Sequence, residues 1–78
     1  MNLSMCYRGG SLTGKEGYLL RFNYDEKFIE DLKQAIPHTL REWRPEEKLW
    51  WVATEYDATL QTLFANFYAL VHQQGVLL

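Results

Sequence analysis

The chain has 78 residues, of which 47% are hydrophobic and 15% aromatic. This composition excludes a disordered chain and predicts a single domain over residues 1–78 with an aromatic core. The net charge of −2 argues against an obligate nucleic-acid binder, which usually carries a basic excess. Cys6 is the only cysteine, which fits a reducing compartment, and no apolar run approaches the roughly 18 residues of a membrane span. We therefore expect a cytoplasmic protein without membrane contact.

The first half of the chain predicts two strands followed by a helix. Residues 3–7 form a short strand, and residues 9–17, which hold four of the five glycines, form a flexible Gly-rich loop. Residues 18–24 alternate in the manner of a half-buried strand. Asp25 fits a helix N-cap, with Tyr24 and Ile29 at the positions of a hydrophobic staple. Pro37 ends this helix, which is predicted over residues 25–36.

The second half predicts a β-hairpin and a long helix. Residues 39–44 and 48–53 flank the compact turn Pro45-Glu46-Glu47. In-phase pairing places four side chains on one face and five on the other. The first face carries Arg41, Trp43, Trp50 and Val52, and the second carries Leu40, Glu42, Arg44, Leu49 and Trp51.

Thr54 and Asp57 have the spacing of a variant capping box, and a helical stripe follows them as far as a C-terminal glycine, Gly75. The stripe consists of Leu60, Leu63, Phe64, Phe67 and Val71. The order of elements predicts an α+β fold, a small two-layer (β)βαββα sandwich with an antiparallel or mixed sheet and both helices on one face.

One segment matches the G-x-x-x-x-G-K pattern of a phosphate-binding loop, from Gly9 to Lys15. Such a loop needs a Ser or Thr after the lysine and then a helix whose N-terminus faces the phosphates. Here Glu16 occupies the hydroxyl position and a strand follows. The pattern therefore favours a hairpin loop, and we expect no cofactor.

Residues that could bind a metal or act in catalysis are few and isolated. Cys6, His38 and His72 lack the paired spacing of metal ligands. A nucleophile would have to meet a histidine and an orienting acid, and no pattern in the chain supports that. The sequence predicts neither a metal site nor an enzyme.

The hairpin carries three tryptophans on two short strands. We expect Trp43 and Trp50 to pack under the helices, which places Trp51 on the opposite face beside Leu49 and Arg44 and near Arg21. If that face is open, Trp51 and the two arginines form a stacking platform for nucleic acid. If the N-terminal segment or a second copy of the chain covers it, Trp51 has a structural or protein-contact role. Both alternatives remain open at this point.

About half of the chain, residues 18–54, resembles the HARP domain, a small module found beside annealing-helicase motors and similar to modules of some phage helicases. The resemblance rests on a lysine-to-proline run followed by an Arg-x-Trp and a Lys-x-Trp-x-Val pattern. The matching residues are Lys33, Pro37, Arg41, Trp43, Lys48, Trp50 and Val52. The resemblance implies binding of structured or single-stranded DNA in the service of a helicase.

Two functions from different classes follow. The first is a helicase-associated accessory module that contacts single-stranded or forked DNA through Arg21, Arg41, Arg44, Lys48 and Trp51. The second is a protein-interaction or homo-oligomeric module whose apolar sheet face and tail, Val76-Leu77-Leu78, are buried in a partner. The steep salt dependence of nucleic-acid binding separates the two.

Overall fold

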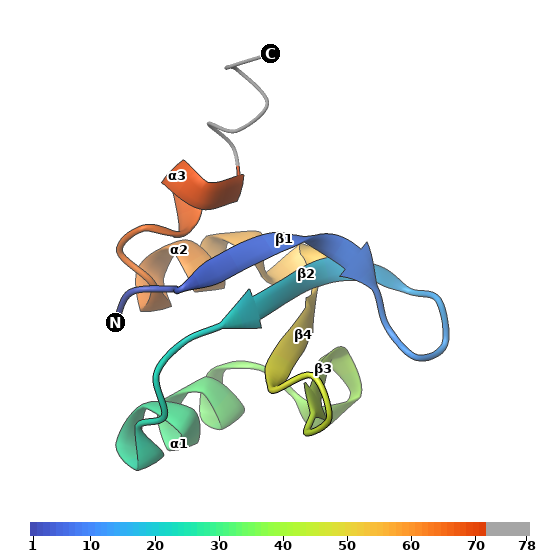
Figure 1. Ribbon diagram of the computed structural model, residues 1–78, viewed down its shortest axis with the longest axis horizontal. Helices are drawn as coiled ribbons and strands as arrows, with labels where there is room; N and C mark the ends of the chain where they lie inside the picture. Colours follow the sequence, from blue (N-terminus) through green and yellow to red (C-terminus); the bar gives the residue numbers. More distant parts are fainter. Residues whose placement is uncertain (72–78) are drawn as a thin grey trace.

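The computed structural model describes residues 1–71, which form a four-stranded antiparallel sheet and three α-helices (Figure 1). The α+β prediction is confirmed. The strands are β1 (Met5–Gly10), β2 (Glu16–Arg21), β3 (Arg41–Arg44) and β4 (Leu49–Ala53), in the order β1-β2-β4-β3. The helices are α1 (Glu26–Ala35), α2 (Asp57–Leu63) and α3 (Phe67–Val71). Within these residues, no helix has the length and apolar character needed to cross a membrane.

The hairpin of β1 and β2 is longer than the sequence indicates. Gly9 and Gly10 extend β1, Glu16 and Gly17 begin β2, and only residues 11–15 lie between the strands. Gly17 lies opposite Gly9. A Cβ on Gly17 would overlap the indole of Trp51 and the carbonyl oxygen of Val52. Glycine at this position therefore lets the hairpin lie directly against Trp51.

Helix α1 follows its sequence signals closely. The carboxylate of Asp25 accepts a hydrogen bond from the Phe28 amide at 3.0 Å, as an N-cap should. The helix ends at Ala35, two residues before Pro37. Leu32 and Ile36 are fully buried, so the apolar side of α1 packs against the core.

The predicted hairpin register is also confirmed. Trp43 pairs with Trp50, and Glu42 pairs with Trp51. The strand β4 is central and buried along its whole length, whereas β3 has only four residues and lies at the sheet edge. Lys48, in the turn between them, has a positive φ of 55°.

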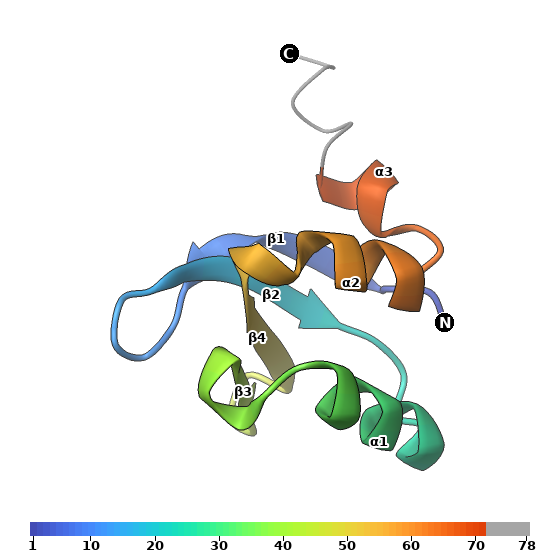
Figure 2. The ribbon, with the colours of Figure 1, turned by 180° about the vertical axis from the view of Figure 1, so that it is seen from behind.

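All three helices pack on one face of the sheet, here called the helix face, and Figure 2 shows α1 and α2 on its near side. The buried strand residues of this face are Cys6, Tyr18, Leu20, Trp50 and Val52. They contact Leu32 and Ile36, together with Leu60, Phe64 and Phe67 from the C-terminal part. The expectation that Trp43 belongs to this core is wrong: its side chain is 49% exposed because β3 is an edge strand.

The long second helix is also a wrong prediction, because the chain leaves the helical conformation at Phe64 (φ −121°, ψ 118°). Asn66 explains the break: its side chain accepts a hydrogen bond from the Leu3 amide at 2.8 Å and donates one to the Leu3 carbonyl at 3.0 Å. The break still allows Phe64 and Phe67 to be fully buried. Gly75, the expected end of this helix, lies outside the described residues.

The predicted capping box of Thr54 and Asp57 is not observed, because Thr54 does not occupy the N-cap position of the second helix. Residues Thr54–Tyr56 make a 3-10 turn, and Tyr56 precedes α2 without a side-chain cap. The carboxylate of Asp57 accepts hydrogen bonds from the Tyr18 hydroxyl at 2.6 Å and from the side-chain Nε2 of Gln61 at 2.5 Å. Asp57 therefore links α2 to the sheet.

Candidate ligand-binding groove

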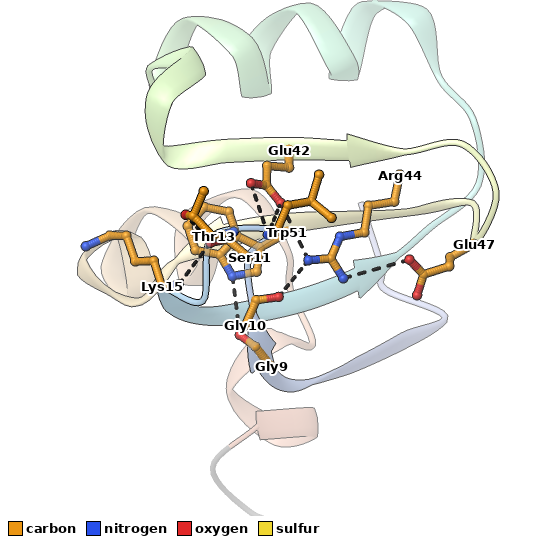
Figure 3. A network of polar contacts seen from close by, with 10 residues as sticks. Gly9, Gly10, Ser11, Thr13, Lys15, Glu42, Arg44, Glu47 and Trp51 are labelled. Atoms are coloured by element: carbon orange, nitrogen blue, oxygen red, sulfur yellow. Dashed lines mark hydrogen bonds and ion pairs between the residues drawn. The ribbon is translucent and has the colours of Figure 1, made fainter.

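The opposite side of the sheet, here called the hairpin face, is closed. Its buried residues are Leu19, Leu49, Trp51 and Ala53. The tip of the β1–β2 hairpin bends across this face, and the indole Nε1 of Trp51 donates to the Gly9 carbonyl at 3.3 Å (Figure 3). Trp51 is only 1% exposed. An open platform at Trp51 is therefore excluded, and the covering segment is the N-terminal hairpin.

Arg44 holds this cover in place from the other edge of the sheet. Its Nη2 donates to the Gly10 carbonyl at 2.6 Å, and its guanidinium lies 3.5 Å from Glu42 and 3.8 Å from Glu47 (Figure 3). Glu42 in turn accepts from the Leu12 amide at 3.1 Å. The Arg44 side chain is 12% exposed, so this arginine is occupied in closing the hairpin face.

The residues that match the phosphate-loop pattern form the hairpin turn. The Ser11 hydroxyl accepts from the Thr13 amide at 3.2 Å and from the Lys15 amide at 2.9 Å. Lys15 forms an ion pair with Glu55 at 3.2 Å, and a strand follows, as the sequence predicts. A helix N-terminus that could face a phosphate does not follow this loop.

The other three predicted site residues, Arg21, Arg41 and Lys48, line an exposed groove beside the β3–β4 hairpin. Arg21 donates to the main-chain carbonyls of Glu47 at 2.9 Å and Lys48 at 3.4 Å. Arg41 donates from Nε to the Ile36 carbonyl at 2.8 Å. Neither arginine has a carboxylate within ion-pair distance among residues 1–71.

This aromatic groove consists of two adjoining hollows of about 580 and 550 Å³ that share Tyr24, Ile29, Trp43 and Trp50. The first hollow extends toward the β3–β4 turn and the second along α1. Tyr24 is 77% exposed and Trp43 49% exposed, while Trp50 is buried beneath them. The Trp43 and Trp50 rings lie 5.3 Å apart, so the floor of the groove is a continuous aromatic surface.

The charges around the groove are balanced. Its basic residues are Arg21, Lys33, Arg41 and Lys48, and its acidic residues are Glu26, Glu30, Glu46 and Glu47. A polyanion would gain attraction from the first set and meet repulsion from the second. This lining suits a ligand without a large net charge.

Sequence reasoning missed Tyr24 and Trp43 as exposed site residues. The hairpin pattern identifies the two faces, yet it cannot show which strand is at the sheet edge, and that position exposes Trp43. Tyr24 had a usable signal, because it stands between a strand and a helix N-cap. A side chain at such a junction can lie at the rim of the core.

The buried titratable groups lie apart from the groove. Burial and, secondarily, the carboxylate of Asp57 raise the pKa of the Cys6 thiol from 9.0 to about 12. Burial and the hydrogen bond to Asp57 raise the pKa of Tyr18 from 10.0 to about 12. Both groups are protonated at neutral pH, and a protonated thiol is a poor nucleophile.

Among residues 1–71, no cluster of three or more His, Cys, Asp or Glu side chains could hold a metal ion.

Comparison with known proteins adds no family: the chain matches no protein-family model, and searches of curated proteins and of solved structures return no match. The resemblance to the HARP domain stays a prediction, and the aromatic groove is the site on which a functional proposal can rest.

Proposed function

We propose that this protein is a non-catalytic binding module of the cytoplasm that holds a segment of another protein in its aromatic groove. The observation that carries the proposal is the exposure of Tyr24 and Trp43 at two adjoining hollows, with the Trp50 ring packed against Trp43 beneath them. Aromatic side chains are enriched at protein interfaces, where they bury a large area at low conformational cost. Two such side chains at the rim of adjoining hollows supply anchor positions for a partner.

A protein ligand fits the groove better than nucleic acid. Phosphate neutralisation provides most of the affinity of nucleic-acid binding. Four acidic residues surround the groove beside four basic ones, Arg44 is occupied by the hairpin, and Trp51 is buried. Of the five residues expected to contact DNA, only Arg21, Arg41 and Lys48 line the groove, so the predicted DNA-binding set is not brought together at one site.

A helicase-associated role in binding single-stranded or forked DNA is the second candidate, and one observation favours it. Trp43 exposes an aromatic ring close to Arg21 and Lys48, which line the same hollow. A base stacked on an exposed aromatic ring gains about 1–3 kcal/mol. In this alternative, Trp43 takes the stacking role that the sequence assigns to Trp51.

The test is a selection of displayed linear peptides on the immobilised protein, followed by anisotropy measurements with the selected peptides and with labelled oligo-dT. We expect peptide binding that Trp43→Ala removes and that increasing salt changes little, because apolar contacts dominate. Tyr7→Ala is the matched control, since Tyr7 is a 45% exposed aromatic residue on β1. Oligo-dT binding that exceeds peptide binding, depends on Trp43 and falls steeply with salt would favour the second candidate.

A further inference from the structure

The free edge of β3 borders the aromatic groove, and the geometry points to a specific binding mode: we infer that the partner enters as an added β-strand along β3. This inference rests on the proposed function and specifies the chemistry of its ligand. The ligand is an extended, uncharged segment with apolar side chains at alternate positions. Such strand addition takes affinity from main-chain hydrogen bonds and specificity from alternate side chains.

Within residues 1–71, β3 pairs only with β4, so its outer edge has no main-chain partner. The edge at β1 differs, because α3 contacts that strand from the helix face (Figure 1). The N-terminal residues before β1 are also engaged, through hydrogen bonds of Met1 and Leu3 to residues 65 and 66. An incoming strand therefore finds main-chain donors and acceptors at β3 and a partly covered edge at β1.

Exposed edge strands are commonly protected by charged side chains that prevent pairing with another chain. Three of the four residues of β3 are charged, and this composition could serve that purpose. In the structure these side chains are held by their own chain. Arg41 donates to the Ile36 carbonyl, Arg44 donates to the Gly10 carbonyl, and Glu42 accepts from the Leu12 amide. The charged side chains of β3 are thus held in contacts within the protein, which leaves the main-chain edge of β3 accessible to another strand.

The groove has the shape that an added strand requires. Helix α1 runs along the β3 side of the sheet (Figure 3), and the second hollow is lined by residues of both elements. Trp43, in the middle of β3, borders both hollows. Side chains on one face of a strand repeat about every 6.6–6.8 Å. Consecutive side chains on the groove side of an added strand can therefore enter the two hollows, one on each side of Trp43.

The two faces of the sheet determine the pattern of the ligand. On the groove side, the added strand meets Tyr24, Ile29 and Trp43, which favour apolar side chains. On the other side, Glu42 and Arg44 already bind the hairpin tip, so that side offers a polar surface. The balanced charges of the groove give no advantage to a charged segment. Alternation of apolar and uncharged polar residues matches both sides.

The probe is a library of labelled heptapeptides with Thr at odd positions and Val, Leu, Phe or Tyr at even positions, added to the intact protein. Control peptides have the same composition with the apolar residues contiguous, or have Glu or Lys at the even positions. We expect micromolar binding of alternating members only. We also expect Trp43→Ala to remove it and Tyr7→Ala to leave it unchanged.

Two measurements test strand pairing itself. Methylation of peptide amides one at a time should weaken binding about fivefold or more at alternate positions, because each removed hydrogen bond is worth about 1 kcal/mol. Amide hydrogen exchange of the protein should slow at alternate residues of β3. Trp43-dependent binding with no alternation in either measurement would overturn strand addition and leave the proposed function intact. Absence of peptide binding from both this library and the displayed one would overturn both.

Discussion

The two faces of the sheet are closed by different means. The helix face is covered by apolar side chains of α1, α2 and α3, with Leu20, Leu32, Phe64 and Phe67 completely buried. The hairpin face is covered by main chain, because Gly9 lies against Leu19 of the neighbouring strand β2 and Gly17 lies against Trp51 of β4. Two hydrogen bonds connect the hairpin tip to β3: Arg44 donates to the Gly10 carbonyl, and the Leu12 amide donates to the Glu42 carboxylate. The comparison indicates that the helix face supplies most of the stability and that the hairpin face depends on close fit.

The largest expected effect is on the helix face. Phe67 is fully buried and packs edge-on against Tyr18, with ring centroids 5.1 Å apart. Phe67→Ala should reduce the free energy of unfolding by about 3–5 kcal/mol, through lost burial and a cavity. Urea unfolding followed by circular dichroism measures the change. A loss below about 1 kcal/mol would contradict the assignment of this face as the main source of stability.

The hydrogen bond between Tyr18 and Asp57 gives the next effect, and it depends on pH. Tyr18→Phe should cost about 1.5–3 kcal/mol at neutral pH, because the acceptor is a carboxylate. The raised pKa values of Tyr18 and Cys6 mean that the folded protein keeps protons that the unfolded chain loses. The contribution of these two groups to the free energy of unfolding should therefore be fully present below pH 9 and decrease as the pH rises toward 12.

Unfolding curves measured across this alkaline range provide the check. Tyr18→Phe should show a shallower decline than the parent, since only the Cys6 contribution remains. An identical alkaline slope in the two proteins would show that Tyr18 does not titrate as proposed.

Gly17→Ala tests the close fit of the hairpin face. The new methyl group would overlap the Trp51 indole and the Val52 carbonyl, and such overpacking costs about 1–3 kcal/mol. Gly10→Ala is the matched control, because its Cβ would meet its nearest neighbour at an ordinary 3.8 Å. Thermal melting of both variants measures the difference. Equal melting temperatures would mean that the hairpin can move away from Trp51 at little cost.

Arg44→Met should have the smallest effect, about 1.5 kcal/mol, the lower end of the range for a hydrogen bond with a charged partner, through loss of the bond to the Gly10 carbonyl. The methionine keeps much of the apolar stem of the arginine side chain. Hydrogen exchange of the Leu12 amide is the sensitive measurement, because this amide bonds to Glu42 beside Arg44. Unchanged exchange would show that the hairpin tip is held without Arg44.

Short sequence patterns predicted the elements whose bounds depend on neighbouring residues, namely α1 and the β3–β4 hairpin. The N-cap at Asp25 and the stop at Pro37 give α1 within one residue at each end, and alternation gives the register of Trp43 with Trp50. The break before α3 could not be predicted, because Phe64 and Phe67 both continue the helical stripe. Its cause is the contact of Asn66 with Leu3, which lies 63 residues away in the chain.

The candidate site was predicted less well for a related reason. Alternation separates Trp43 from Trp51, yet burial depends on which strand lies at the sheet edge and on what covers each face. The glycines of the N-terminal loop indicate flexibility in the sequence. In the fold, the absence of a side chain at Gly17 creates the space that Trp51 fills. Only the tertiary arrangement shows that Trp51 is inaccessible and Trp43 accessible.

The contact of Asn66 with Leu3 also has a consequence for synthesis of the protein. The strands β1 and β2 are adjacent in sequence and can pair soon after they leave the ribosome. The segment before β1 forms its hydrogen bonds later, because its partners Ala65 and Asn66 are among the last described residues to be translated. During translation residues 1–3 therefore present unpaired main chain, the state in which edge-to-edge misassociation arises. The exposure ends only after residues 65 and 66 have emerged from the ribosome and bonded to Met1 and Leu3.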